Sequence, residues 1–278
     1  SKYIFVFFII SILFSFTVYL KFNKTNFTSA GHPYHEIIKG DSAHYFLKAE
    51  IFKKNIEENN AFFFTGEYQS SFLYPILLGA YYESINQDLF KKNKINGIKI
   101  INNNNLGFGF IILQTILYFY SIYYLSIKLR EKIPVHILKY IIFFLSLEPT
   151  IFQFHGLFMT ETLYLSFLNI FIAYSFSPKK SYIANFFFGF LIGLSYLIKT
   201  TSILLVIPFS IYLICIFKKE SFLIIVNLIF GYLIVLFMLG LINYNRSGVF
   251  YFTPTQSMDA PYWYMSHIID ARSKNISN

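Results

Sequence analysis

The chain has 278 residues, of which 55% are apolar and 13% are charged, and it contains 36 Phe and 23 Tyr. With a mean hydropathy of +0.52, this composition excludes an ordinary soluble domain and predicts a membrane protein that crosses the bilayer several times. The net charge of +9 comes from short basic clusters beside apolar runs, which argues against nucleic acid as a partner, and a single cysteine excludes an intrachain disulfide.

The first apolar run covers residues 3–20 and is long enough to cross a hydrocarbon layer of about 30 Å. Lys2 precedes this run, and no small-residue cleavage site follows it. These features favour a retained transmembrane helix over a cleaved signal peptide.

A long polar loop is predicted over residues 21–105. Within it, residues 41–53 carry apolar side chains at helical spacing, which predicts an amphipathic helix on the membrane surface. Residues 71–85 are apolar but too short to span, and they contain Pro75. We expect them to form a second helix that lies at the interface or re-enters the membrane.

Further apolar runs follow with short connections between them. Together with the first run, they predict an all-α polytopic membrane protein with about seven transmembrane helices. We expect residues 1–242 to form one transmembrane module. The polar and aromatic tail, residues 243–278, is interpreted either as the start of a missing C-terminal part or as the end of a short protein. The further runs are residues 106–127, 134–151, 156–176, 182–198, 200–217 and 221–242.

Basic residues in the short connections predict the orientation of the chain. Under the positive-inside rule, these connections lie in the cytoplasm, and the four basic groups agree with one another. The long loop 21–105, the turn 148–161, the turn at Lys199 and the tail are then non-cytoplasmic. The basic groups are Lys2; Lys128, Arg130 and Lys132; Lys179 and Lys180; and Lys218 and Lys219.

Several ionisable or aromatic polar residues are predicted to share this non-cytoplasmic face. Charged side chains at the end of a span are costly unless they are paired or face water, so they are candidates for a functional site. The candidates are Asp41 with His44 and Tyr45; Glu67; Glu148, His155 and Glu161; and Lys199 with Arg246.

These residues also have structural interpretations. Asp41 stands before a periodic apolar run, where Asp commonly caps a helix N-terminus. Glu161 suits the positive end of a helix dipole. Lys199 can extend its charged end to the membrane surface, Tyr45 can be an interfacial anchor, and Glu67 can be an ordinary loop acid.

An ordered set of motifs resembles a known family and covers nearly the whole chain. The motifs are GDSAHYFLKA, SSFLYPILLGAYY, SIKLREK at the end of a span, SLEPTIFQFHGLFMTETLYLSFLNIFIAYS, GFLIGLSYLIKTTSILLVIPF and NYNRSGVFYFTPTQS. In this order they are similar to the membrane glycosyltransferases of the C superfamily, in particular the branch of protein O-mannosyltransferases and bacterial lipid A and lipopolysaccharide sugar transferases.

This resemblance implies at least seven transmembrane helices and a long first outer loop that carries two surface helices. It also implies a catalytic Asp in that loop, which matches Asp41, and a polyprenyl-phosphate sugar as the donor, with inversion of the anomeric centre. Chemically, a carboxylate can accept the proton of the attacking hydroxyl, and cations can hold the departing phosphate. Asp41 would be the base, and Lys199 and Arg246 would bind the phosphate.

Tyr45, Glu67 and Glu161 are expected to contact the substrate. No cofactor is assigned, and a divalent metal stays an alternative, since the candidates contain no tight ligand pair such as DxD. The predicted function is transfer of a sugar to a lipid, glycan or protein acceptor at the non-cytoplasmic face of a bacterial inner membrane or of the endoplasmic reticulum, among membrane lipids.

Two other functions stay open. A transporter or flippase of lipid-linked glycans should place ionisable residues near the bilayer midplane on broken helices, whereas the charges here collect at one face. A truncated, non-catalytic remnant of a transferase is the other alternative.

Overall fold

The computed structural model describes residues 2–23, 45–46, 48–50, 52–54, 73–89, 107–147, 158, 160–176, 181–247, 250 and 252. Within these residues all regular structure is helical and no strand occurs, which confirms the all-α prediction. The helices are α1 (Lys2–Asn23), α3 (Leu73–Ser84), α4 (Gly107–Arg130), α5 (Val135–Leu147), α7 (Thr160–Ser175), α8 (Tyr182–Ile198), the 3-10 helix η1 (Thr200–Leu205), α9 (Val206–Phe217), the 3-10 helix η2 (Lys218–Glu220) and α10 (Ser221–Ser247).

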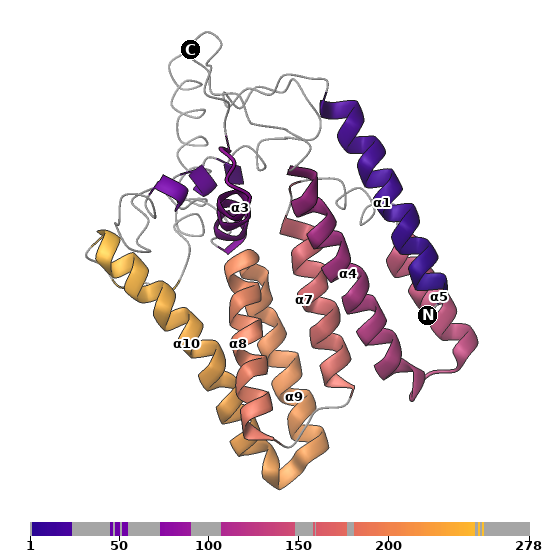
Figure 1. The fold of residues 1–278 in the computed structure, drawn as a ribbon. Coiled ribbons are helices and arrows are strands. Elements are labelled where there is room, and N and C mark those ends of the chain that lie inside the picture. The colour runs from indigo at the N-terminus through magenta and orange to yellow at the C-terminus, as the bar shows by residue number, and fades with distance from the viewer. Residues whose placement is uncertain are drawn as a thin grey trace, which may run out of the picture.

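The longer helices run side by side between two ends of the molecule, and α3 lies at one end, above α8 (Figure 1). We call the end that carries α3 the upper end, as drawn in Figure 1. The α4–α5 turn and the α9–α10 turn lie at the opposite, lower end. Basic residues Lys128 and Arg130 occupy the last turn of α4, and Lys218 begins η2. The upper end therefore holds α3, while these basic turns gather at the lower end.

The length and composition of the described helices support the predicted membrane character, but they do not establish the predicted seven spans. Among the described residues, three segments are long and apolar enough to cross a membrane: Phe108–Arg130, Thr200–Phe217 and Ser221–Tyr244. The apolar helices Tyr3–Thr17, Val135–Leu147 and Tyr182–Ile198 are shorter. Large apolar side chains cover the outside of the bundle, as shown by Phe222, which is 72% exposed, and Ile183, which is 70% exposed. Such continuous apolar surface is expected against lipid and not against water.

Aromatic side chains form the core at the upper end. Tyr45, Phe46, Tyr74, Tyr82 and Phe110 are all buried there. The described residues between 45 and 54 are helical, as predicted for the first surface segment. They pack closely on α3, because a Cβ at Gly79 would lie 3.0 Å from the carbonyl oxygen of Ala49. The two predicted surface helices thus pack against each other.

An ionic contact also joins these two segments. Lys53 Nζ lies 3.1 Å from Glu83 Oε2 and 3.8 Å from Asp88 Oδ1. It also donates to the carbonyl oxygen of Gln87 at 3.1 Å. The Lys53 side chain is 11% exposed, whereas the two acids are about half exposed. The lysine therefore closes the C-terminal end of α3, where a cation is electrostatically favoured.

Helices α8 and α10 pack through glycines. Gly189 and Gly193 are four residues apart on α8, a spacing that lets two membrane helices approach closely. A Cβ at Gly189 would lie 2.7 Å from the carbonyl carbon of Leu228 on α10, and one at Gly193 would lie 2.6 Å from Val235 Cβ. On α10, a Cβ at Gly231 would lie 2.9 Å from the Phe190 backbone nitrogen. The two backbones are therefore in direct contact.

Polar side chains connect α7 to its neighbours. Asn169 Nδ2 of α7 donates to Ser121 Oγ of α4 at 3.1 Å in a buried position. Near the lower end, Tyr174 Oη donates to Asn185 Oδ1 of α8 at 3.1 Å. Hydrogen bonds of this kind fix the register of helices in lipid, where water cannot replace the lost partner.

Candidate functional site

Two oppositely charged residues meet at the upper end of the bundle. Glu161 lies in the first turn of α7, and Lys199 follows the last residue of α8. Lys199 leaves the helical conformation, with φ −147° and ψ 116°, and its backbone N–H donates to the Ser195 carbonyl oxygen. The 3-10 helix η1 begins directly afterwards. This break in the helix places the lysine side chain beside α7, and Lys199 Nζ lies 3.4 Å from Glu161 Oε1.

Further groups hold this pair. Thr160 Oγ1 donates to Glu161 Oε2 at 3.2 Å. The Tyr164 ring, one turn along α7, lies under the ammonium at 5.6 Å from Lys199 Nζ to the ring centroid. The lysine side chain is 40% exposed and the glutamate side chain 22%. Since an ammonium has three N–H donors and the carboxylate accepts from one of them, an incoming anion can reach Lys199.

A buried aromatic layer packs around Tyr74 at the same end of the molecule. The Tyr74 ring packs edge to face on Tyr45 at 5.0 Å and on Phe110 at 5.7 Å between ring centroids. Burial raises the pKa of the Tyr74 phenol well above its usual value, and nearby Tyr45 and Glu161 raise it further, while the Gln114 amide lowers it. The phenol is therefore a neutral O–H donor.

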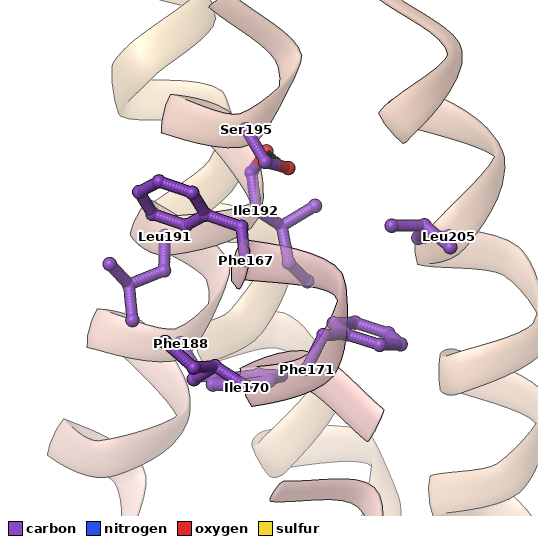
Figure 2. A pocket seen from close by; sticks show the side chains of 8 residues that line it. All are labelled: Phe167, Ile170, Phe171, Phe188, Leu191, Ile192, Ser195 and Leu205. Atoms are coloured by element: carbon purple, nitrogen blue, oxygen red, sulfur yellow. Dashed lines mark hydrogen bonds between the residues drawn. The ribbon is translucent and has the colours of Figure 1, made fainter. Parts of the chain in front are cut away.

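An apolar hollow lies below the ion pair, between α7, α8 and η1 (Figure 2). Its cavity volume is about 10 Å³, which is close to what one water molecule needs. In Figure 2, Leu205 stands apart, across from the side chains of α7 and α8, and Ser195 lies at the upper edge. Ser195 is one turn before Lys199 on α8, so the hollow adjoins the charged site. Its lining consists of Phe167, Ile170, Phe171, Phe188, Leu191, Ile192, Ser195 and Leu205.

Three of the predicted site residues are thereby located. Glu161 and Lys199 are brought together as an ion pair, and Tyr45 packs on Tyr74. Arg246 lies in the last turn of α10, because this helix continues to Ser247 and not only to the predicted end at residue 242. The Arg246 side chain is outside the description. The predicted residues Asp41, His44, Glu67, Glu148 and His155 also lie outside the described residues.

Sequence reasoning missed Tyr74, Gln114 and Tyr164. Tyr164 carried a usable signal, since it follows Glu161 by three residues and so shares its helix face. Gln114 is a lone amide within an apolar run, which was a weaker signal. Tyr74 carried none, because a tyrosine in a short apolar segment is typical of a membrane interface. Among the described residues, no group of three or more His, Cys, Asp or Glu could hold a metal ion.

No protein-family model, curated protein or solved structure matches the chain.

Proposed function

We propose that the protein is an inverting glycosyltransferase of the membrane, which moves a sugar from a polyprenyl-phosphate donor to a lipid, glycan or protein acceptor. The observation that carries the proposal is the exposed ammonium of Lys199 directly above the apolar hollow. An anionic head and an isoprenoid tail match these two features in charge and polarity. The lining residue Phe167 lies six residues after Glu161 on α7, which is about 9 Å along the helix axis.

The charged site supports a role in leaving-group stabilisation. When the acceptor hydroxyl attacks the anomeric carbon, the bond between that carbon and the phosphate oxygen breaks and its electrons go to the phosphate. Lys199 holds the negative charge that develops there, as a preorganised cation does at other leaving groups. By the motif resemblance, Asp41 takes the hydroxyl proton, Arg246 assists the phosphate, and Tyr45, Glu67 and Glu161 contact the substrate.

The arrangement of the helices supports a non-cytoplasmic site. Helices α1, α4, α5, α7, α8, η1 with α9, and α10 run alternately between the two ends, which fits seven spans (Figure 1). The basic turns at the lower end fit the cytoplasmic side by the positive-inside rule. The Glu161–Lys199 pair then faces the periplasm or the lumen of the endoplasmic reticulum.

Transfer assays with the protein in lipid nanodiscs test this function. A panel of radiolabelled polyprenyl-phosphate sugars is incubated with membrane extracts as acceptors, and the products are counted. We expect transfer by the native protein, loss of transfer in Asp41→Asn, and a donor KM raised about tenfold or more in Lys199→Met, because a charge-assisted hydrogen bond is lost. Lys128→Met, in a basic turn at the opposite end, is the matched control and should leave the KM unchanged.

Two results would overturn the proposal. Equal transfer by the native protein and Asp41→Asn would remove the base from the mechanism. Movement of the labelled lipid across proteoliposome membranes without any sugar transfer would instead identify a transporter.

A further inference from the structure

A lysine stands on an otherwise apolar outer face of α5, near the lower end of the molecule. Lys139 is exposed and lies about 6 Å along the helix axis from the start of α5 at Val135. The residues one turn before and one turn after it share its helix face, and both are apolar: Val135 is 56% exposed and Phe143 is 54% exposed. A charge among such side chains is costly in a membrane unless water or an opposite charge reaches it.

The Lys139 ammonium meets an aromatic ring of another helix. Lys139 Nζ lies 5.9 Å from the ring centroid of Tyr3, which is in the first turn of α1 and is 62% exposed. One turn further along both helices, the Phe7 ring packs edge to face on Phe143 at 5.7 Å between centroids. Helices α1 and α5 therefore run side by side in the same direction, and Tyr3 and Lys139 form the lower of these two contacts.

The ring leaves most of the binding capacity of the ammonium unused. A cation–π contact at an exposed position contributes about 0.5–1 kcal/mol, and it does not use the three N–H donors in hydrogen bonds to oxygen. Within the described ranges, no acidic side chain forms an ion pair with Lys139. An external anion can therefore bind the ammonium beside Tyr3.

The neighbouring turn adds positive charge. The segment from the end of α4 into the α4–α5 turn carries three cations, Lys128, Arg130 and Lys132, and one acid, Glu131. This turn leads directly into α5. The excess of cations produces a positive potential at this end of the molecule, which attracts anions to it.

We propose that Lys139 and Tyr3 bind the head group of an anionic phospholipid, whose acyl chain lies along the exposed apolar surface above them. The ligand must be anionic at the level of Lys139 and apolar at the level of Phe143. A soluble anion matches only the first requirement, and a zwitterionic phospholipid brings a cation of its own into a positive region. The phosphate accepts charge-assisted hydrogen bonds from the ammonium, and anionic lipids bind to basic sites between transmembrane helices in this way. The inference is independent of sugar transfer.

Lipid binding to the purified protein tests the site. Phosphatidylglycerol and phosphatidylcholine with the same acyl chains are titrated onto the protein in detergent, and bound lipid is counted by native mass spectrometry. We expect the native protein to prefer phosphatidylglycerol, and Lys139→Gln to weaken that binding about tenfold without changing the binding of phosphatidylcholine, because one charge-assisted hydrogen bond is lost. Equal binding of the two lipids by the native protein would overturn the inference.

Lys218→Gln is the matched control. Lys218 is also exposed at the lower end, but it lies in the turn between α9 and α10. Its substitution should leave phosphatidylglycerol binding unchanged. Equal losses in Lys139→Gln and Lys218→Gln would show attraction to a general basic rim and would overturn a site at Lys139.

Two more variants separate binding from folding. Lys139→Arg should retain the preference for phosphatidylglycerol, since arginine also pairs with phosphate and stacks on rings. Tyr3→Leu should weaken phosphatidylglycerol binding severalfold in the native background and have no effect in Lys139→Gln, whereas equal effects in both would exclude Tyr3 from the site. All variants should unfold within a few degrees of the native midpoint in lipid-free detergent.

Competition with glycerol phosphate identifies the source of the anion. We expect no displacement of phosphatidylglycerol by glycerol phosphate at the same concentration, because the soluble molecule lacks the acyl chain. Displacement would identify a site for free phosphate esters and would overturn the lipid assignment. Neither outcome bears on sugar transfer, so failure here is distinguishable from failure of the proposed function.

Discussion

The close contact between α8 and α10 gives a prediction whose size follows from the coordinates. In Gly189→Ala, the new methyl group would lie 2.7 Å from the carbonyl carbon of Leu228 and 3.0 Å from its Cα, and closer still to the carbonyl oxygen. Carbon atoms in contact prefer separations of about 3.5–4.0 Å. The two helices must therefore move apart by roughly 1 Å, since both sides of the contact are backbone.

This separation loosens the rest of the interface. Ile192, Leu228, Val235 and Leu239 are all buried in the same cluster. A gap of 0.5–1 Å removes about a quarter to a half of the dispersion energy of each affected atom pair. Overpacking costs about 1–3 kcal/mol, and alanine returns up to about 1 kcal/mol through its better helix propensity. We expect a net loss of about 2 kcal/mol and a midpoint of thermal unfolding lowered by about 5 °C.

Thermal unfolding of the purified variants in one detergent measures this loss. Gly109→Ala is the matched control, because its new methyl group would meet only the outer end of the Tyr81 side chain, which can turn away. We expect Gly109→Ala to remain close to the native midpoint. Equal midpoints for the two variants would refute the view that backbone contact limits this position.

Three further predictions concern other contacts. Asn169→Leu removes the buried hydrogen bond to Ser121 and should destabilise the protein by about 1 kcal/mol. An unchanged midpoint of thermal unfolding would contradict this prediction. Lys53→Met should lower the free energy of unfolding by about 1 kcal/mol, because solvent screens its half-exposed acidic partners. Lys54→Met is the control: its side chain is 57% exposed, and the substitution should have no measurable effect in the same thermal assay. Burial is the main cause that raises the pKa of Tyr74 in the folded protein. The stability that the neutral Tyr74 phenol contributes is therefore present below about pH 10 and is lost above that pH, where the phenol ionises in the unfolded chain. Tyr74→Phe should lessen the fall of the denaturation midpoint at alkaline pH, and an identical fall in both proteins would contradict this cause.

Helix positions followed from the sequence more closely than the site did. The predicted run 182–198 coincides with α8, because polar residues interrupt the apolar pattern on both sides of it. Its break at Lys199 was predicted for the same reason. The end of α10 was placed too early, since Asn243 is polar but buried and the helix continues past it.

The sequence placed Glu161 and Lys199 on one face but did not predict that they touch. Hydropathy reports depth in the membrane and periodicity reports the face of one helix, whereas the partner of a side chain depends on how separate helices pack. The same limit applies to Tyr74 and Gln114, which come from α3 and α4. Their burial follows from the aromatic packing of the upper core, a tertiary property that no local pattern contains.

Helix α9 differs from its neighbours in how loosely it is held. Only 17% of its most apolar window, within Thr200–Phe217, is buried, and Phe209 and Leu213 are its buried contacts. Helix α8, in contrast, is fixed to α10 backbone against backbone. A lipid chain that reaches the hollow from the surrounding bilayer would therefore displace α9 laterally, while α8 keeps Lys199 in place at its upper end.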